Sequence, residues 1–251
     1  MKPVWPPAQN HTFVRLGGWP VLSYFYSMKS NLFALAIFAV STPFAFSATT
    51  YLDTTGDSST VPSLDITSVF VSNDATTLSL RINVAGDPMA ADWGKYLIGF
   101  DTLVGGNTTG PDAWGNPITM SAGGMDYFIG SWLDFGTGAA VLGWSGSSWN
   151  LMSGTGIGVA TSPSSVTLSL NLSALGLSGG STFNFDIYST AIGNSVLDAA
   201  GSSTALTWNN NPYDSGANVL TYTVTAVPEP TAFSVMSLGA FLLARRARRL
   251  A

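Results

Sequence analysis

Apolar and polar residues alternate along most of the chain from residue 65 to residue 224, with the period of two that is typical of half-buried β-strands. The clearest case is 77–84, where leucine, isoleucine and valine occupy every second position. No stretch of ten or more residues favours an amphipathic helix, although 172–177 has room for one turn. About nine segments carry the strand pattern: 65–72, 77–84, 95–102, 125–132, 139–144, 148–152, 166–172, 182–189 and 219–224.

Short strands rich in threonine, serine, valine and glycine are typical of antiparallel β-sandwiches. We therefore expect an all-β fold over residues 48–226: a single antiparallel β-sandwich, jelly-roll-like, with about nine strands. About 180 residues are enough to bury one core. Residues 105–124 have irregularly spaced prolines and a tryptophan, so we expect a long loop there, and loops carry function more often than strands do.

The segment 28–47 has the organisation of a secretory signal peptide. Met28 and Lys29 open a short positive region, residues 32–40 are continuously apolar, and Ala45-Phe46-Ser47 provides a small-residue cleavage site before Ala48. Because this signal is complete from Met28, we interpret residues 1–27 as a mis-assigned start, with a genuine N-terminal extension as the alternative. The mature protein is then expected to begin near residue 48 and to be exported.

The C-terminal residues 227–251 form a second targeting segment. Its first part, Val227-Pro228-Glu229-Pro230, contains the only glutamate of the chain. An apolar run follows over 231–244, and as a helix these residues rise only about 21 Å, against roughly 30 Å of hydrocarbon in a bilayer. Such a short transmembrane segment suits a transient stop. Four arginines after it favour retention of that end in the cytoplasm: Arg245, Arg246, Arg248 and Arg249.

This tail resembles the PEP-CTERM sorting signal of Gram-negative bacteria that produce exopolysaccharide. The resemblance rests on Pro228-Glu229-Pro230, the apolar segment and the arginine cluster, in that order. It implies that an exosortase, a membrane protease-transpeptidase, recognises the motif and removes the tail while the protein is transiently in the inner membrane. The alternative is an ordinary C-terminal anchor that follows a proline-rich linker.

Charge and residue usage exclude several kinds of chemistry. Between the two targeting segments, thirteen aspartates face only two basic residues, Arg81 and Lys95. So acidic a domain is not expected to bind nucleic acid. The same stretch has no histidine, cysteine or glutamate, which excludes thiolate metal sites, disulfides and the usual nucleophile–base pairs.

An acidic turn near the start of the domain is the candidate metal site. Asp53 and Asp57 flank a glycine, and Asp65 follows eight residues after Asp57. Carboxylates on either side of a glycine turn can converge on one hard cation, so we expect a structural Ca²⁺ here. The spacing is not that of an EF-hand, and a plain acidic turn before a strand is the alternative.

The same region resembles the opening of the family 9 carbohydrate-binding-module-like and DOMON-like sandwiches. The matching residues are Asp53, Gly56 and Asp57, then Asp65-Ile66, then the strand 96–101 that ends in an aspartate. The resemblance implies a sandwich with a structural calcium on Asp53 and Asp57, with Asp198 as a further ligand. The Gly/Pro/Tyr-rich insertion of longer relatives is missing here, because residues 58–63 are too few for it.

Three tryptophans in predicted loops are candidate ligand-binding residues: Trp93, Trp114 and Trp208. An aromatic face can stack on a sugar ring, whose C–H bonds meet the negative face of the π-system. The alternative is that each ring packs as a lid on the edge of the sandwich. Trp132 and Trp144 lie in strand patterns, and we expect them in the core.

These observations favour a non-catalytic role. Asp112, Asp126 and Asp134 could serve a glycoside hydrolase or lyase, but nothing in the sequence places two of them across a cleft. We expect an exported, exosortase-sorted protein of the cell surface or extracellular matrix, with a binding or structural β-sandwich. The alternatives are a carbohydrate-binding module for exopolysaccharide and an aspartate-based glycoside hydrolase or lyase.

The tail can be tested by changing its glutamate. We expect the surface form to lack residues 245–251, and Glu229→Ala to remain uncleaved in the inner membrane because the motif is lost. Intact-mass measurement of membrane and surface fractions checks this, with Thr231→Ala as the control that keeps the motif. An unchanged mass and location of the Glu229→Ala protein contradict the sorting interpretation.

Overall fold

The computed structural model describes residues 47–58, 61–191, 195–204, 206 and 212–227. All of the signal segment except Ser47 and all of the sorting tail except Val227 lie outside the described residues, as do the predicted C-terminal helix and the arginine cluster. Within the part of the chain that is described, no helix is long and apolar enough to cross a membrane.

The described chain is all-β, and its strands pair antiparallel in two main sheets. The first sheet has five strands, in the order β1-β2-β3-β10-β9. Their bounds are β1 Ser47–Leu52, β2 Ile66–Asn73, β3 Thr77–Val84, β10 Ser165–Asn171 and β9 Gly158–Ser162. The β2–β3 hairpin predicted from the alternation is therefore present, with residues 74–76 as its turn.

The second sheet has the order β12-β11-β4-β6-β7-β8, and β14 pairs with the first half of β11. Its strands are β12 Val196–Ala199, β11 Thr182–Thr190, β4 Lys95–Asp101, β6 Tyr127–Trp132, β7 Gly138–Trp144, β8 Trp149–Leu151 and β14 Leu220–Thr223. Two short strands, β5 Ile118–Thr119 and β13 Tyr213–Asp214, form a separate parallel pair. The described helical segments are 3-10 turns: η1 Pro62–Leu64, η2 Pro88–Ala91 and η3 Leu172–Leu175.

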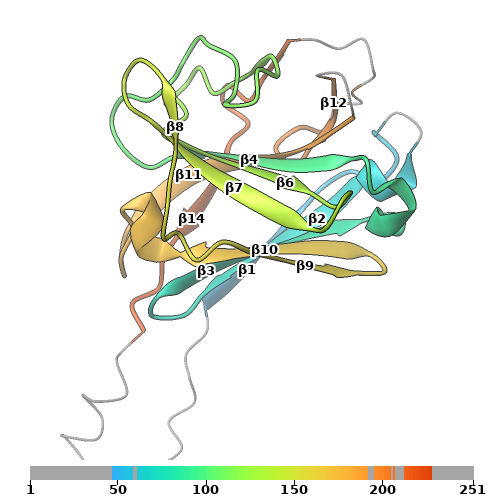
Figure 1. The fold of residues 1–251 in the computed structure, drawn as a ribbon, viewed down its shortest axis with the longest axis horizontal. Helices are drawn as coiled ribbons and strands as arrows, with labels where there is room; N and C mark the ends of the chain where they lie inside the picture. Colours follow the sequence, from blue (N-terminus) through green and yellow to red (C-terminus); the bar gives the residue numbers. More distant parts are fainter. Residues whose placement is uncertain (1–46, 59–60, 192–194, 205, 207–211, 228–251) are drawn as a thin grey trace, which may run out of the picture. The chain divides into compact units, whose positions relative to one another are not determined.

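One apolar core lies between the two sheets, which Figure 1 shows as two layers, with β4, β6 and β7 in one and β3, β10 and β9 in the other. Leu78, Leu80 and Ile82 of β3 are fully buried in this core together with Phe100 and Phe185 of the other sheet. The alternation in β3 thus predicts correctly which of its faces is buried, because side chains of a strand point alternately to its two faces.

A second core covers the opposite face of the second sheet. Ile118, Met120 and Met125 of the long loop pack there with Tyr213 and with Leu97 of β4. Gly99 of β4 makes room for them, since a Cβ at that position would lie 2.7 Å from Met125 Cε and 2.8 Å from Met120 Sδ. The predicted loop 105–124 is therefore largely a covering segment, and it contains β5.

All nine predicted segments form strands, but the predicted number is too low for the described residues. The additional strands are β1, β5, β9, β12 and β13. Strands β1 and β9 lie at the edges of the first sheet and are largely exposed, so they lack the buried apolar positions on which the alternation depends. Strands β5 and β13 have two residues each, too few to show any period.

A buried asparagine at the end of β2 joins the two sheets. Asn73 Oδ1 accepts hydrogen bonds from the Tyr222 hydroxyl (2.8 Å) and the Thr225 amide (3.0 Å). Its Nδ2 donates to the carbonyls of Asp74 (2.8 Å) and Thr225 (3.0 Å). Ser47 pairs with Asn73 in the first sheet, so the start of β1 and the end of β14 lie at the same end of the domain.

The asparagine bonds generate a prediction for stability. Asn73→Ala removes four hydrogen bonds from a site that is 2 % exposed, which should lower the free energy of unfolding by about 2 kcal/mol or more. The melting temperature should fall by roughly 4–8 °C. The control is Asn83→Ala in the neighbouring strand, which removes one partly buried bond to Ser68. Equal melting temperatures for the two variants contradict the assigned role of Asn73.

Candidate metal centre

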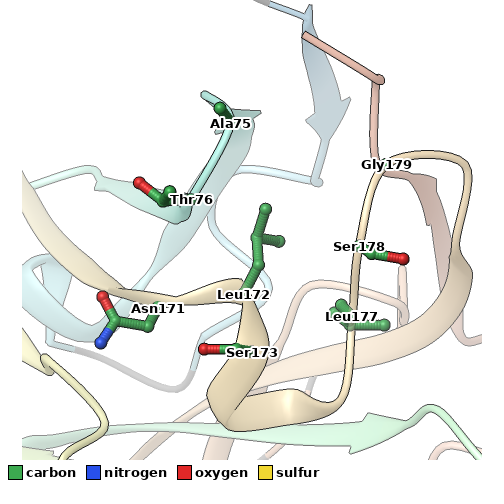
Figure 2. Close-up of a pocket in the computed structure, with 8 residues that line it drawn as sticks. All are labelled: Ala75, Thr76, Asn171, Leu172, Ser173, Leu177, Ser178 and Gly179. Carbon is green, nitrogen blue, oxygen red and sulfur yellow. The ribbon is translucent and has the colours of Figure 1, made fainter. Parts of the chain in front are cut away.

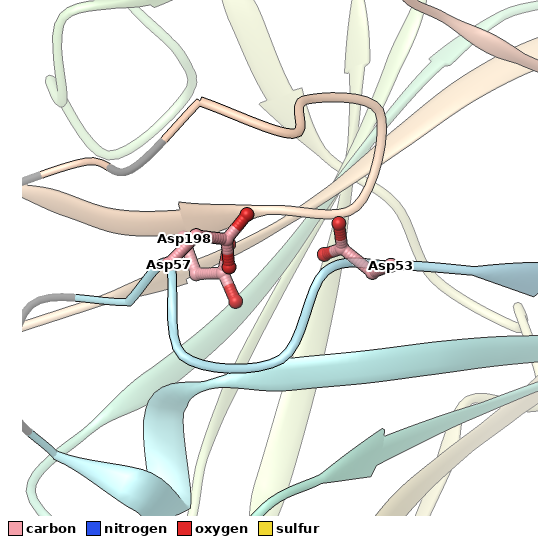
Figure 3. Close-up of side chains that lie close together, drawn as sticks. All are labelled: Asp53, Asp57 and Asp198. Carbon is pink, nitrogen blue, oxygen red and sulfur yellow. The ribbon is translucent and has the colours of Figure 1, made fainter.

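Three aspartates come together where the two sheets meet at the far end of β1. Asp53 directly follows β1, Asp57 lies after the next turn, and Asp198 belongs to β12 of the other sheet. One carboxylate oxygen from each lies within 4.8 Å of the others. Figure 3 shows the three side chains turned toward one another, although they come from segments about 140 residues apart.

The turn that brings Asp53 and Asp57 together depends on Gly56 and Asp65. Gly56 has φ 89°, in the left-handed region that glycine adopts without strain. Its amide donates to both carboxylate oxygens of Asp65, at 3.1 and 2.9 Å. The sequence predicted Asp65 as a metal ligand, but Asp65 is not one of the three aspartates that come together. Its carboxylate holds the backbone of the turn instead.

The third aspartate is fixed by bonds that link the sheets. Asp198 Oδ2 accepts a hydrogen bond from the amide of Ile66 in β2 (2.6 Å), and its Oδ1 accepts one from the Ala199 amide (2.8 Å). On the other side, the Asp57 carbonyl accepts a bond from the Leu206 amide (3.1 Å). The acidic cluster is thus built from both sheets and from the segment that follows β12.

Several oxygens of the cluster are buried without a partner. Asp57 is only 6 % exposed, and neither of its carboxylate oxygens has a hydrogen bond from another described residue. Asp53 Oδ2 is likewise buried without a hydrogen-bond partner, and so is the hydroxyl of Ser58, the residue after Asp57. A buried carboxylate without hydrogen bonds or a counter-charge costs several kcal/mol, so these groups need either a proton or a bound cation.

Burial changes the acidity of the three aspartates. It raises the pKa of Asp53 to about 7, and the nearby charges of Asp57 and Asp186 add to the effect. It raises the pKa of Asp198 to about 8, with Asp53 as the next cause. The pKa of Asp57 is also raised, by burial and by the charge of Asp65. The raised pKa values of Asp53 and Asp198 mean that these two carboxyls hold protons near neutral pH when no cation is bound.

Protein cations do not supply that charge in the described domain. Arg81 lies over the Phe70 ring, 4.8 Å from its centroid, on the first sheet. Lys95 Nζ lies 2.7 Å from Asp134 Oδ1. The donor set is therefore made of oxygen alone, which suits Ca²⁺ or Mg²⁺ and not the metals that prefer imidazole or thiolate.

A fourth aspartate beside the cluster was not identified from the sequence. Asp186 of β11 is fully buried and accepts hydrogen bonds from the Ile187 amide (2.8 Å), the Gly201 amide (3.0 Å) and the Ser215 hydroxyl (2.7 Å). It lies on the strand face opposite Phe185, where the alternation indicates exposure to solvent. The segment after β12 covers that face, and this could not be read from the local pattern.

The predicted ligand-binding tryptophans lie in different surroundings. Trp114 is 37 % exposed, and its ring contacts those of Phe128 and Trp132 on the second sheet. Trp93 is partly buried and packs against the core between the sheets. Trp208 lies outside the described residues.

The expectation that Trp132 and Trp144 belong to the core is wrong. Neither is among the buried residues, because Ile129 of β6 and Val141 of β7 already take the positions that face the first sheet. The strand period then places both tryptophans on the other face. There Trp132 contacts Trp114, and Trp144 contacts Trp149.

The three aspartates considered for catalysis each have a local partner. Asp112 is buried and accepts bonds from the amides of Trp114 and Asn116. Asp126 Oδ2 accepts bonds from the amides of Thr102 and Leu103, and Asp134 pairs with Lys95. The partners of each of these carboxylates therefore account for its position in the fold.

A pocket of about 360 Å³ lies at the Asn73 end of the domain, away from the acidic cluster. Figure 2 shows its lining, which consists of small or hydroxyl-bearing residues, two leucines and one asparagine: Ala75, Thr76, Asn171, Leu172, Ser173, Leu177, Ser178 and Gly179. It has no titratable side chain and no aromatic ring, so it offers little for catalysis or for sugar stacking.

Comparisons with family models, with curated proteins and with solved structures found no match for this chain.

The raised pKa values predict how the metal-free protein responds to pH. Folded Asp53 and Asp198 titrate near 7 and 8, whereas unfolded aspartate titrates near 3.8. Between about pH 4 and pH 8 the folded state therefore holds protons that the unfolded chain has released, and stability falls as pH rises through this window. In chelator, the melting temperature should be higher at pH 5 than at pH 8.

Asp53→Asn should reduce this slope, whereas Asp92→Asn, a change of the same charge at an exposed position, should leave it unchanged. Thermal scans in chelator across the range check both variants. A melting temperature that is constant or rises with pH contradicts the burial of ionisable carboxyls at this site.

Proposed function

We propose that this chain is an exported, non-catalytic β-protein of the cell surface or extracellular matrix, whose fold is stabilised by a calcium ion on Asp53, Asp57 and Asp198. The observation that carries the metal proposal is the buried Asp57 carboxylate, which lies beside two other carboxylates and accepts no hydrogen bond from another described residue. The two stacked sheets support a jelly-roll-like β-sandwich as the fold class in this proposal.

Calcium is the cation that the site favours. Ca²⁺ takes six to eight oxygen ligands in a flexible arrangement, and water or backbone carbonyls can complete a set of three carboxylates. Mg²⁺ requires a stricter octahedron and releases its water reluctantly. In this proposal the ion replaces the missing counter-charge and takes no part in a reaction.

The cellular part of the proposal rests on the two targeting segments. The signal at 28–47 directs export, and the PEP-CTERM-like tail at 227–251 directs exosortase sorting through the inner membrane. An acidic domain without cysteine suits life outside the cell, where charge keeps it soluble. The structural partners of the three central aspartates favour this role over a glycoside hydrolase or lyase.

Carbohydrate binding is the second candidate function, and one observation favours it. Trp114 keeps more than a third of its surface exposed while its ring contacts a second tryptophan on the sheet. A matrix protein with such a surface can hold exopolysaccharide without changing it.

Calcium binding can be measured as a thermal shift of the purified protein. At a hundredfold excess over Kd, a ligand that binds only the folded state adds about 2.7 kcal/mol, which raises the melting temperature by roughly 5–10 °C. Magnesium should give a smaller shift. The double variant Asp53→Asn, Asp57→Asn should lose the calcium shift, and in chelator it should melt no lower than wild type because it removes buried charge.

Asp92→Asn is the matched control, since it removes an exposed aspartate from a different turn and should keep the full shift. If wild-type protein melts at the same temperature in calcium and in chelator, the proposed site does not exist.

A further inference from the structure

An aromatic surface lies on the second sheet, on the face that points away from the first sheet. We define the tryptophan face as Trp114 and Trp132, together with Phe135 of the turn that follows Trp132. The rings of Trp114 and Trp132 lie with their centroids 6.3 Å apart at 41°, and Phe128 supports Trp114 from the side, at 5.6 Å and 67°. The three residues come from the long loop, from β6 and from the β6–β7 turn.

Glycines in the sheet form the floor under both indoles. A Cβ on Gly130 would lie 2.2 to 2.5 Å from three atoms of the six-membered ring of Trp114, so that ring lies flat over the backbone of β6. A Cβ on Gly138 would lie 2.5 Å from Trp132 Cζ2, which places the second indole over β7 in the same way. With one face of Trp114 on the sheet, its 37 % exposed surface belongs to the outer side.

Phe135, in the turn that follows Trp132, is displayed to solvent at an energetic cost. Its φ of 54° lies in the left-handed region, and it is the only described residue other than glycine with a positive φ. For an aromatic residue this conformation costs roughly 1–2 kcal/mol, and the ring, fully exposed to solvent, recovers nothing by packing. The Trp132 Nε1 donates to the Gly136 carbonyl (3.0 Å), so the strained turn is tied to the tryptophan face. Strain that displays an unpacked ring points to a binding role.

A polar pair flanks the rings. Lys95 is the cross-strand partner of Trp132, and its Nζ lies 2.7 Å from Asp134 Oδ1 in the same turn as Phe135. Both side chains are about one fifth exposed, so they offer hydrogen-bond donors and acceptors beside the aromatic surface. Apolar rings with a few fixed polar groups are the usual composition of a small-ligand site.

The charge of the domain indicates the occupant. Thirteen aspartates face two basic side chains, and Lys95 is already paired, so an anionic polymer is repelled. A pyranose ring presents C–H bonds that stack on the indole face and hydroxyls that reach a Lys–Asp pair. We propose that the tryptophan face binds an uncharged polysaccharide. This rests on the non-catalytic binding role proposed above, but not on the calcium site.

The test measures binding of the purified full chain to a panel of neutral polysaccharides with different backbones, by affinity electrophoresis and calorimetry, with and without calcium. We expect at least one to bind. Trp114→Ala should weaken that binding by about tenfold or more, because a stacked ring is lost. Phe135→Gly should also weaken it while keeping or raising the melting temperature, because glycine adopts the left-handed conformation without strain.

Leu151→Ala is the control, since it removes a 74 % exposed apolar side chain from β8 of the same sheet. Binding that survives both aromatic variants, or no binding to any neutral polysaccharide of the panel, overturns the proposal. Concentration-dependent self-association that Phe135→Gly abolishes, without any sugar binding, assigns the surface to a second copy and also overturns it. All three variants should keep the rise in melting temperature with calcium. Loss of sugar binding and loss of the metal site can therefore be told apart.

Discussion

At one end of the domain the two sheets meet at a buried acidic cluster that no basic side chain of the described residues balances. Asp53 and Asp57 come from the segment after β1 of the first sheet, and Asp198 comes from β12 of the second, so repulsion among them acts directly between the two layers. A bound cation turns this repulsion into a cross-link. At the opposite end, Asn73 makes the corresponding connection with neutral hydrogen bonds to Tyr222 and Thr225. If the proposed cation binds, only one of the two connections between the sheets depends on ions.

The period of the sequence was sufficient to find nine strands, and it placed the core positions of β3 and β10 correctly. It missed β12, whose four residues are all buried and therefore show no alternation. It could not find β1 or β9, because edge strands bury little. The prediction also misplaced Trp132 and Trp144, because a large apolar residue in a strand suggests the core. Each lies an odd number of residues from the core residue of its own strand, Ile129 or Val141, and therefore points to the other face. The alternation sorts the residues of a strand into two faces, but which of these faces packs against the other sheet depends on the tertiary structure.

The acidic site shows the same division between local and distant information. Asp53, Gly56 and Asp57 are close in sequence, so the turn could be predicted from its residues, whereas Asp198 was added only through a family resemblance. Asp65 was predicted as a ligand because it is acidic and near, but its carboxylate is occupied by the Gly56 amide. Asp186 was missed because its burial depends on a covering segment far along the chain. Charge in the sequence thus located the site without separating ligands from the residues that shape it.

The position of Asn73 has a mechanical consequence. The Asn73 side chain makes hydrogen bonds to both the backbone amide and the backbone carbonyl of Thr225. Thr225 lies two residues before Val227, so tension applied at Val227 is transmitted to these two bonds. The acidic cluster lies beyond the other end of β1, roughly 17 Å away, outside that path. Force applied at Val227 therefore reaches the neutral hydrogen bonds of Asn73 first, whereas the acidic cluster, which responds to pH and to any bound ion, lies outside that path.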